Sequence, residues 1–385
     1  MARHPTRGET TDGPKTPTVY DVADRAGVSI ATVSRVLRTP DAVRETTRAR
    51  VLDAVRDLGY VPSGNARALA GRKTGVIGLC FPGHDGLEEA DRPAPGSAAA
   101  GGVRIVDDRR RGAGWQSPNL YFDEVLRGAE VEAWRRGFAL MVAAGRGPAR
   151  DVIVNDIAGR VDGLAVLART VSDDLLVHVA RRLPVVVLAD AARTGTNPLA
   201  GLDQVSVDNA AGMAALVTHV VRGLGVRDVV YVAGPPDSPD DAERQRGLFA
   251  ALDAVGLDRA AVPHVRGDFR RDTAEAAVTE LLARRVPRAL VCANDQSALG
   301  AMDALGRRGL SVPGDVYVTG FDGLDVGRFT QPPLTTVAQP MAELGRAAVR
   351  AVVARLADPA AAPLSARLPV EVLLRESCPP VDTSM

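Results

Sequence analysis

The chain has 385 residues, a length that suits two or three domains and excludes a small fold stabilised mainly by disulfides or metals. Hydrophobic residues make up 46% and charged residues 24% of the sequence, which is typical of a globular protein and not of a disordered or membrane protein. The formal net charge is zero, but residues 1–73 contain 13 Lys and Arg against 8 Asp and Glu, which makes the N-terminal part basic and the remainder acidic. This separation favours contact between the N-terminal part and nucleic acid.

Residues 1–16 lack hydrophobic periodicity, and we expect them to form a flexible tail. They also lack the apolar centre of a secretion signal, and the chain has no apolar run long enough to span a membrane. We therefore expect a cytoplasmic protein without a membrane segment. Cys80, Cys292 and Cys378 are odd in number and have unrelated spacings, so free thiols are expected, with no metal and no cofactor.

Residues 17–61 show the pattern of a small domain of three short helices. Thr18 and Asp21 have the spacing of a capping box at the start of the first helix, which Gly27 ends. Ser29 is of the type that caps the N-terminus of a helix, here a second helix over 30–37. Apolar residues at three- and four-residue intervals predict that the two helices pack together, as in a helix-turn-helix.

The opposite face of the second helix carries short side chains and arginine. Short side chains let a helix approach the major groove of DNA closely, and arginine binds base edges there. A plain helical hairpin is the alternative. The residues expected on this face are Ile30, Ala31, Ser34, Arg35 and Arg38.

Residues 18–29 and 32–37, followed by 58–62 and 65–70, closely resemble the DNA-binding head of the LacI/GalR family of bacterial repressors. The resemblance implies a sequence-specific transcriptional regulator, a repressor, whose partner is double-stranded operator DNA. It also places three further residues of the head at the DNA. These are Thr18, Ser29 and Thr32.

Two residues of the head depart from the family's pattern. Arg38 stands where Asn is common, and we expect it to add a phosphate or base contact. Arg44 stands where Ser caps the third helix, so this cap is expected to be weaker or to be supplied by Asp41.

Residues 62–73 match the family's hinge helix and linker. The stretch is too short to be stably helical alone, so it is expected to fold on the operator. The resemblance implies that the two hinge helices of a dimer enter the minor groove, where Leu69 wedges between base pairs and Asn65 and Arg67 contact DNA. The alternative is that Leu69 is a linker residue packed on the body.

From residue 74 the pattern changes to short apolar runs that alternate with amphipathic helices. Val-rich runs without alternation predict parallel strands covered on both faces, and the length suits two doubly wound α/β lobes. The Gly- and Pro-rich stretch 84–118 is longer than a usual loop and is expected to be a mobile insertion, or a solvated loop without function. The expected strands are 76–81, 139–143, 164–167, 185–189, 229–233, 290–293 and 316–321, and the expected helices are 122–136, 210–222, 246–255, 273–285 and 297–308.

Polar residues follow several of these strands, at the ends where α/β lobes bind ligands. Asp190, Asn294 and Asp322 each come directly after an apolar run. Arg244 and Phe269 lie in connections between elements. Carboxylates, an amide and a guanidinium around an aromatic ring suit a polyol, because hydroxyls donate and accept hydrogen bonds while the C–H face stacks. The set favours a sugar-like ligand, although each residue alone would be a helix cap or a surface charge.

The body resembles the family's ligand-sensing domain over 74–378, outside the insertion. In the sugar-responsive branch, the resemblance implies that these same five residues contact the effector. It also implies that Tyr121 and Phe122 line the pocket, with core packing as the alternative for this pair. Pro184 lies one residue farther from Asp190 than in the family's pattern, which makes Asp190 the least secure of the set.

The family's architecture implies that the chain passes three times between two lobes like those of periplasmic sugar-binding proteins. The N-terminal lobe is expected at 74–206 and 339–366, and the C-terminal lobe at 207–338 and 367–378. An effector between the lobes would bias a hinge motion. Few residues follow Arg375, which leaves no room for a tetramer-forming tail, so a homodimer on a near-palindromic operator is expected.

Two other classes of protein are less consistent with the sequence. A periplasmic sugar-binding protein would share the two lobes but would need a secretion signal and would lack the head. An enzyme would need a catalytic motif such as a nucleophile elbow, a phosphate loop or a metal cluster, and the sequence has none at a plausible site. We therefore expect no catalytic residues.

Overall fold

The computed structural model describes residues 17–38, 40–60, 73–83, 120–145, 150–189 and 197–381. The chain divides into two compact units, one ending at Thr74 and the other beginning at Gly75. The expected tail, nearly all of the expected hinge and the 84–118 insertion lie outside the described residues.

The first unit consists of α1 (Val19–Ala26), α2 (Ile30–Arg38), the short 3-10 helix η1 (Pro40–Ala42) and α3 (Glu45–Leu58). As the spacing predicted, the apolar faces of the first two helices pack together, and α3 completes the core. The buried residues of this core are Val22, Ala23, Ala26, Val33, Val36, Val51 and Ala54.

The ends of these helices follow the predicted capping. Thr18 and Asp21 form the capping box of α1, and Gly27 ends that helix in the left-handed conformation with φ +60°. Ser29 Oγ accepts a hydrogen bond from the backbone N of Thr32 at 3.2 Å and so caps α2. Arg44 makes no side-chain cap to α3, and Asp41 instead accepts from Arg48 at 3.1 Å, so Asp41 does not supply the cap.

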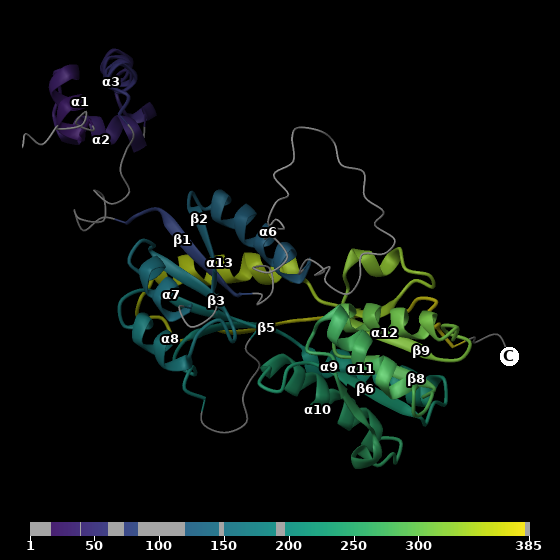
Figure 1. Ribbon diagram of the computed structural model, residues 1–385. Coiled ribbons are helices and arrows are strands. Elements are labelled where there is room, and N and C mark those ends of the chain that lie inside the picture. Colours follow the sequence, from purple (N-terminus) through teal and green to yellow (C-terminus); the bar gives the residue numbers. More distant parts are fainter. Residues whose placement is uncertain are drawn as a thin grey trace, which may run out of the picture. The chain divides into compact units, whose positions relative to one another are not determined.

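The second unit contains two sheets of six strands each, covered by helices on both faces as expected (Figure 1). The first sheet is entirely parallel and has the strand order β11-β5-β4-β3-β1-β2. We refer to this sheet and its helices as the first lobe. Its strands are β1 (Val76–Pro82), β2 (Ala139–Gly145), β3 (Gly163–Leu167), β4 (Val185–Leu188), β5 (Asp203–Val207) and β11 (Ser365–Leu368).

The second sheet has the order β12-β10-β9-β8-β6-β7, and only β12 runs antiparallel to its neighbour. This sheet and its helices form the second lobe. Its strands are β6 (Val229–Ala233), β7 (His264–Arg266), β8 (Ala289–Cys292), β9 (Tyr317–Asp322), β10 (Thr335–Ala338) and β12 (Glu371–Leu373).

The described helices of the first lobe are α6, α7, α8 and α13, and those of the second lobe are α9 to α12. The bounds are α6 (Leu120–Arg135), α7 (Arg150–Ala158), α8 (Asp173–Ala180), α9 (Asn209–Thr218), α10 (Pro239–Asp253), α11 (Arg271–Leu282), α12 (Asp295–Arg307) and α13 (Met341–Ala357). Three short pieces are η4 (His219–Gly223), η5 (Arg259–Ala261) and η6 (Asp325–Arg328).

The chain passes between the lobes in three short segments, after β5, after β10 and after β11. In the first sheet β5 and β11 are neighbours at one edge, and in the second sheet β10 and β12 are neighbours at one edge. The three connections therefore lie together at one side of the lobes, which is the arrangement of a hinge.

Several element boundaries differ from the sequence-based expectations. The helix expected over 246–255 is α10, which begins seven residues earlier, at Pro239. Ser238 caps it and Pro239 occupies its first turn, a favoured place for proline. The sequence also did not predict β5, β7, β10, β11 and β12. These strands are short, and β7 and β11 alternate between exposed and part-buried residues, so they lack the long apolar run that marked the others.

Candidate functional site

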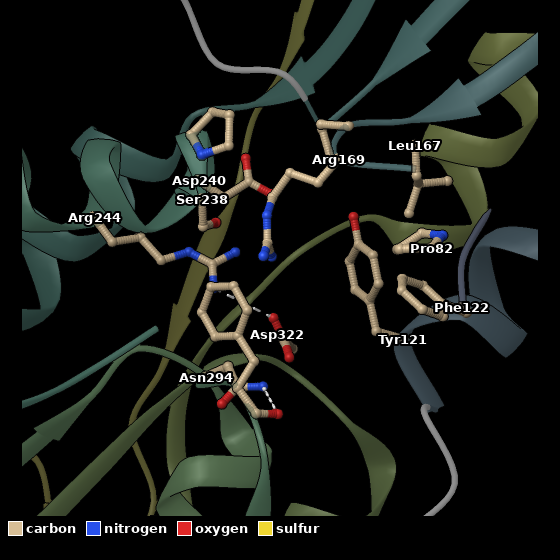
Figure 2. A pocket seen from close by; sticks show the side chains of 14 residues that line it. Pro82, Tyr121, Phe122, Leu167, Arg169, Ser238, Asp240, Arg244, Asn294 and Asp322 are labelled. Atoms are coloured by element: carbon tan, nitrogen blue, oxygen red, sulfur yellow. Dashed lines mark hydrogen bonds and ion pairs between the residues drawn. The ribbon is translucent and has the colours of Figure 1, made fainter. Parts of the chain in front are cut away.

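A pocket lies between the two lobes, at the carboxyl ends of the strands (Figure 2). Apolar and aromatic side chains from β1, α6 and the ends of β3 and β4 line its first-lobe side, and polar side chains line most of its second-lobe side. The lining residues are Pro82, Tyr121, Phe122, Leu167, Ala168, Arg169, Ala189, Ser238, Pro239, Asp240, Arg244, Phe269, Asn294 and Asp322.

Six of the seven residues predicted to bind a ligand lie in this pocket. They are Tyr121, Phe122, Arg244, Phe269, Asn294 and Asp322. The seventh, Asp190, lies outside the described residues, and Ala189, which precedes it in the sequence, lines the pocket.

Arg244 is almost completely buried and is held from several sides. It lies within α10, not in the preceding connection as expected, because the helix starts early. Its Nε donates to Asn209 Oδ1 at 2.8 Å, and its Nη1 donates to the carbonyl oxygen of Ala293 at 2.7 Å. The guanidinium lies 3.9 Å from the centre of the Phe321 ring, close enough for a cation–π interaction. These contacts fix one edge and one face of the guanidinium, so its orientation toward the pocket is preset.

Asp322 and Asp295 are two buried carboxyls at this end of the second sheet. Asp322 Oδ1 lies 3.8 Å from Arg244 Nη1 and accepts a hydrogen bond from Gln339 Nε2 at 2.7 Å. Burial raises the pKa of Asp322 to about 8, although Arg244 lowers it, and the charge of Asp295 adds to the rise. Burial thus favours the protonated form, and a protonated carboxyl can donate as well as accept a hydrogen bond.

Asp295 does not line the pocket but holds the backbone that follows Asp322. Its carboxyl accepts from Thr336 Oγ1 at 2.6 Å and from the backbone N of Leu324 at 2.7 Å. Burial raises its pKa to about 6, while these hydrogen bonds lower it. Asp322 itself has φ +133°, a backbone conformation that these surrounding contacts must maintain. Asp295 is thus a positioning residue, a role that the sequence analysis did not predict.

Asn294 and Phe269 are joined to each other. Asn294 Oδ1 caps α12 by accepting from the backbone N of Ser297 at 2.9 Å, and Nδ2 donates to the carbonyl oxygen of Phe269 at 3.2 Å. Asp268 and Phe269 both have positive φ, +53° and +61°. This strained turn places the Phe269 ring directly over Gly234, where any β-carbon would overlap the ring. Asn294 thus caps α12 and lines the pocket at the same time.

Tyr121 and Phe122 lie at the start of α6 on the first-lobe side. Phe122 packs on Phe81 with ring centres 5.1 Å apart, and both aromatic residues also pack against the core of the first lobe. The Tyr121 hydroxyl is buried and has no hydrogen-bond partner among the described residues, and Figure 2 shows it pointing into the pocket. The two alternatives considered for this pair, pocket wall and core packing, are both present.

The sequence analysis missed three polar residues of the pocket: Arg169, Ser238 and Asp240. Arg169 follows β3 in the same way that Asp190 follows β4, so the strand-end rule could have identified it. Ser238 and Asp240 were missed because the start of α10 was placed too late, although Ser followed by Pro is a recognisable helix start. Asp240 Oδ1 accepts from Asn209 Nδ2 at 2.8 Å, which joins it to the partner of Arg244.

The predicted DNA-binding face has the expected exposure where it is described. Thr18, Ser29, Ile30, Ala31 and Arg35 are exposed, and Thr32 and Ser34 are partly buried. The side chain of Arg38 is not described, and the predicted hinge contacts Asn65, Arg67 and Leu69 lie outside the described residues.

Three further observations concern the described ranges. All three cysteines are free, as expected, and all three are buried. Within these ranges no helix is both long and apolar enough to cross a bilayer. The same residues contain no group of three His, Cys, Asp or Glu side chains placed to hold a metal ion.

Comparison with known proteins identifies the family. Residues 18–63 match the family of bacterial regulatory proteins called the lacI family, and residues 218–378 match the periplasmic binding protein-like domain. The chain is 31% identical over 336 residues to the HTH-type transcriptional repressor CytR of Escherichia coli K12, which covers 86% of this chain and 87% of the relative. The chain belongs to the LacI family. It is therefore a DNA-binding transcriptional regulator.

Solved structures of this LacI-family fold are similar over nearly the whole chain. The transcriptional regulator CelR in complex with cellobiose has a TM-score of 0.63 at 29% identity and covers 94% of this chain and 99% of its own. The lac repressor dimer bound to operator and the anti-inducer ONPF has a TM-score of 0.73 at 25% identity and covers 95% of this chain and 100% of its own. The predicted fold class, a helix-turn-helix head followed by two α/β lobes, is confirmed.

Proposed function

We propose that this LacI-family regulator is a repressor whose operator binding is controlled by a small-molecule effector, a sugar or sugar derivative, bound in the pocket between the lobes. The observation that carries the proposal is the convergence of Arg244, Asn294 and Asp322 with the Phe269 ring in that pocket. A sugar presents hydroxyls that need both donors and acceptors, and a C–H face that packs on an aromatic ring. The six described candidates are thus proposed as effector contacts, together with Asp190.

The second-lobe side of the pocket supplies both kinds of hydrogen-bonding group. The Arg244 guanidinium donates only, the Asn294 amide donates and accepts, and the Asp322 carboxyl accepts and, when protonated, donates. The first-lobe side offers Tyr121 and Phe122, whose rings are apolar surface with one buried hydroxyl. This polarity suits a compact, polyhydroxylated ligand with one apolar face.

The proposed mode of DNA binding is based on the similar structure of the lac repressor, a dimer bound to operator. We propose a homodimer on a near-palindromic operator, with the exposed face of α2 in the major groove of each half-site. The hinge contacts Asn65, Arg67 and Leu69 belong to the same proposal.

Leu69→Ala is expected to lose most operator affinity and DNA bending, because this substitution removes the side chain that wedges between base pairs. Unimpaired DNA bending by this variant, measured by fluorescence energy transfer, would refute the wedge.

We further propose that the protein is not an enzyme and that it acts in the cytoplasm. The relative CytR is named a transcriptional repressor, and a regulator of this kind needs access to chromosomal DNA. The domain boundaries proposed are those expected above, with the head at 17–61, the hinge at 62–73 and the sensing domain at 74–378.

The experiment that tests this function has two parts. A thermal-shift screen of the full chain against sugars and nucleosides should give a ligand that raises the melting temperature, because ligand binding stabilises the folded state. Fluorescence anisotropy on an operator selected from random DNA should then show that this ligand changes operator affinity. A ligand that stabilises the wild type and Asp322→Ala equally would contradict the assigned pocket, and turnover of the ligand would contradict the absence of catalysis.

A further inference from the structure

Besides the Arg367–Glu243 contact between β11 and α10, an ion pair joins the two lobes directly beside the pocket. Arg169 follows β3 in the first lobe, and Asp237 follows β6 in the second. Arg169 Nε donates to Asp237 Oδ2 at 2.9 Å, and Arg169 Nη2 lies 2.7 Å from Asp237 Oδ1. This two-point contact between a planar guanidinium and a carboxylate is the most directional form of ion pair. Each side chain therefore restricts the position of the lobe that carries the other.

The position of this pair in the sheets places it away from the hinge. In the first sheet β3 lies two strands from β5, the strand that leads into the first connection between the lobes. In the second sheet β6 lies three strands from β10, which leads into another connection. Neighbouring strands are about 4.8 Å apart, so the pair is offset from the connecting segments by roughly 10 Å or more in each lobe. A rotation that opens the lobes about those segments must separate Arg169 from Asp237.

The pair also lies beside a second cavity. Arg169 lines the pocket described above, and Arg169 and Asp237 together line a second, more open cavity. The other residues of this second cavity are Arg150, Asp151, Val171, Ser172 and Asp173. Figure 2 shows the Arg169 side chain extending across the pocket from the strands of the first lobe toward Ser238 and Asp240. The Arg169 side chain thus contributes to the lining of both cavities.

The backbone of Arg169 supports a specific role for this residue. Its φ is +67°, in the left-handed region that residues other than glycine, asparagine and aspartate seldom adopt. Such a conformation persists only where the surroundings impose it, and it is concentrated at functional sites.

We propose that the Arg169–Asp237 ion pair holds the lobes closed over the pocket in the effector-free protein and must break before an effector can enter. The proposal rests on the proposed function only in taking the pocket as the effector site. The side chains of Arg169 and Asp237 are 36% and 65% exposed, so the surrounding water weakens their attraction. Loss of the pair is therefore expected to raise the ratio of open to closed molecules by about 2- to 5-fold.

Lobe separation in the full-length, effector-free protein tests the proposal. Exposed Val152 on α7 and exposed Ala250 on α10 are replaced by cysteine and labelled with a fluorophore pair. The three native cysteines are buried and are not expected to react. Single-molecule energy transfer then measures the closed and open populations. Asp237→Asn and Arg169→Gln should each raise the open population, because each removes one charge of the pair.

The chain offers a matched control. Arg271 and Asp303 form the same two-point ion pair at 2.6 and 3.0 Å, with side chains that are 43% and 32% exposed, but both residues lie in the second lobe. Asp303→Asn should therefore leave the distance distribution unchanged. High salt should open the wild type and have a smaller effect on Asp237→Asn, since screening weakens only an intact pair.

The charge-reversed double variant R169D/D237R provides the decisive comparison. Aspartate tolerates the left-handed backbone at position 169, so the reversed pair can form in the same place. Recovery of the closed population in this variant, relative to both single variants, supports the proposal. Single variants with the wild-type distribution, or a double variant no more closed than the singles, overturn it. Because these measurements use no effector, they are independent of whether the screen above finds a sugar ligand.

Discussion

Gln339 is bonded twice to Asp322: its backbone N donates to the Asp322 carbonyl oxygen at 3.0 Å, and its Nε2 donates to Asp322 Oδ1 at 2.7 Å. Gln339 lies in the connection between β10 and α13, one of the three segments that join the lobes. A carboxyl of the pocket is therefore tied directly to the hinge. A change in the hydrogen bonds of Asp322 can therefore shift Gln339 and, through it, α13 of the first lobe.

This relationship predicts the behaviour of Gln339→Leu. The variant leaves the buried Asp322 carboxyl without its side-chain donor, which is expected to cost about 1–3 kcal/mol of stability. Operator binding should persist, while the effector-induced change in operator affinity, measured by anisotropy, should be reduced. Gln204→Leu is the matched control, because Gln204 Nε2 donates to the Leu199 carbonyl oxygen at 2.8 Å in the first lobe, away from the pocket. Equal effector responses in the two variants would show that Gln339 is only a structural residue.

A second prediction concerns Arg35, which is exposed on α2. If Arg35 binds a guanine in each half-site, Arg35→Ala should reduce discrimination at one base position by about 1–3 kcal/mol. Binding to a library of operator variants, repeated at several salt concentrations, measures this. A variant that weakens binding to all sequences equally and lowers the salt dependence would identify Arg35 as a phosphate contact instead.

The sequence predicted the buried strands, and the polar residues at their carboxyl ends that line the pocket, better than it predicted the edges of the sheets. Runs such as 229–233 are apolar on both faces because helices cover both sides, and that composition is visible without the structure. By contrast, β7 and β11 lie at sheet edges with exposed side chains, so their apolar signal is weak. Such edge strands form because they pair with a strand that is distant in the sequence, and a local sequence pattern does not reveal that pairing.

The same reasoning explains which pocket residues could be predicted. Asn294 and Asp322 follow apolar runs directly, so the strand-end rule identified them. The positioning role of Asp295 was not predicted, because it depends on Thr336 and Leu324, which are distant in sequence. Likewise, a contact between Arg169 and Asp237 requires both lobes to be assembled, and the sequence alone carries no signal for it.

The raised pKa of Asp322 predicts a pH-dependent stability. Its ordinary pKa is 3.8 and its folded value is about 8, so between these pH values the folded protein holds a proton that the unfolded chain releases. The stabilising contribution is complete below about pH 4 and is lost as the pH rises to 8. Asp295 acts in the same direction but only up to about pH 6, and His264, whose pKa is lowered by burial from 6.5, acts in the opposite direction below that value.

In the window from pH 6.5 to 8.5 the contribution of Asp322 is therefore the largest of these effects, since the three buried thiols act in the same direction only as the pH approaches their ordinary pKa of 9.0. The free energy of unfolding, measured by urea titration, should fall for the wild type across this window. Asp322→Asn cannot release the proton and should show a flatter profile, whereas Asp295→Asn should retain a fall with pH. A wild-type stability that stays constant or rises between pH 6.5 and 8.5 would contradict the raised pKa.

The last prediction concerns the contact between α6 and α13, which joins the aromatic wall of the pocket to the hinge. A β-carbon added at Gly345 of α13 would overlap the carbonyl oxygen of Val125, and one added at Gly128 of α6 would overlap that of Ala342. The two helices thus touch backbone to backbone through reciprocal glycines. Gly345→Ala must push the two helices apart or distort them, and overpacking of this kind typically costs about 1–3 kcal/mol.

Gly306→Ala on α12 is the matched control, since no atom lies within 4 Å of a β-carbon there. That variant should be neutral or more stable by up to about 1 kcal/mol, because alanine favours a helix more than glycine does. Urea unfolding of both variants compares the two effects directly. Equal stability of the two variants would mean that the helices can separate without loss, and that α6 and α13 do not behave as one rigid body between the pocket and the hinge.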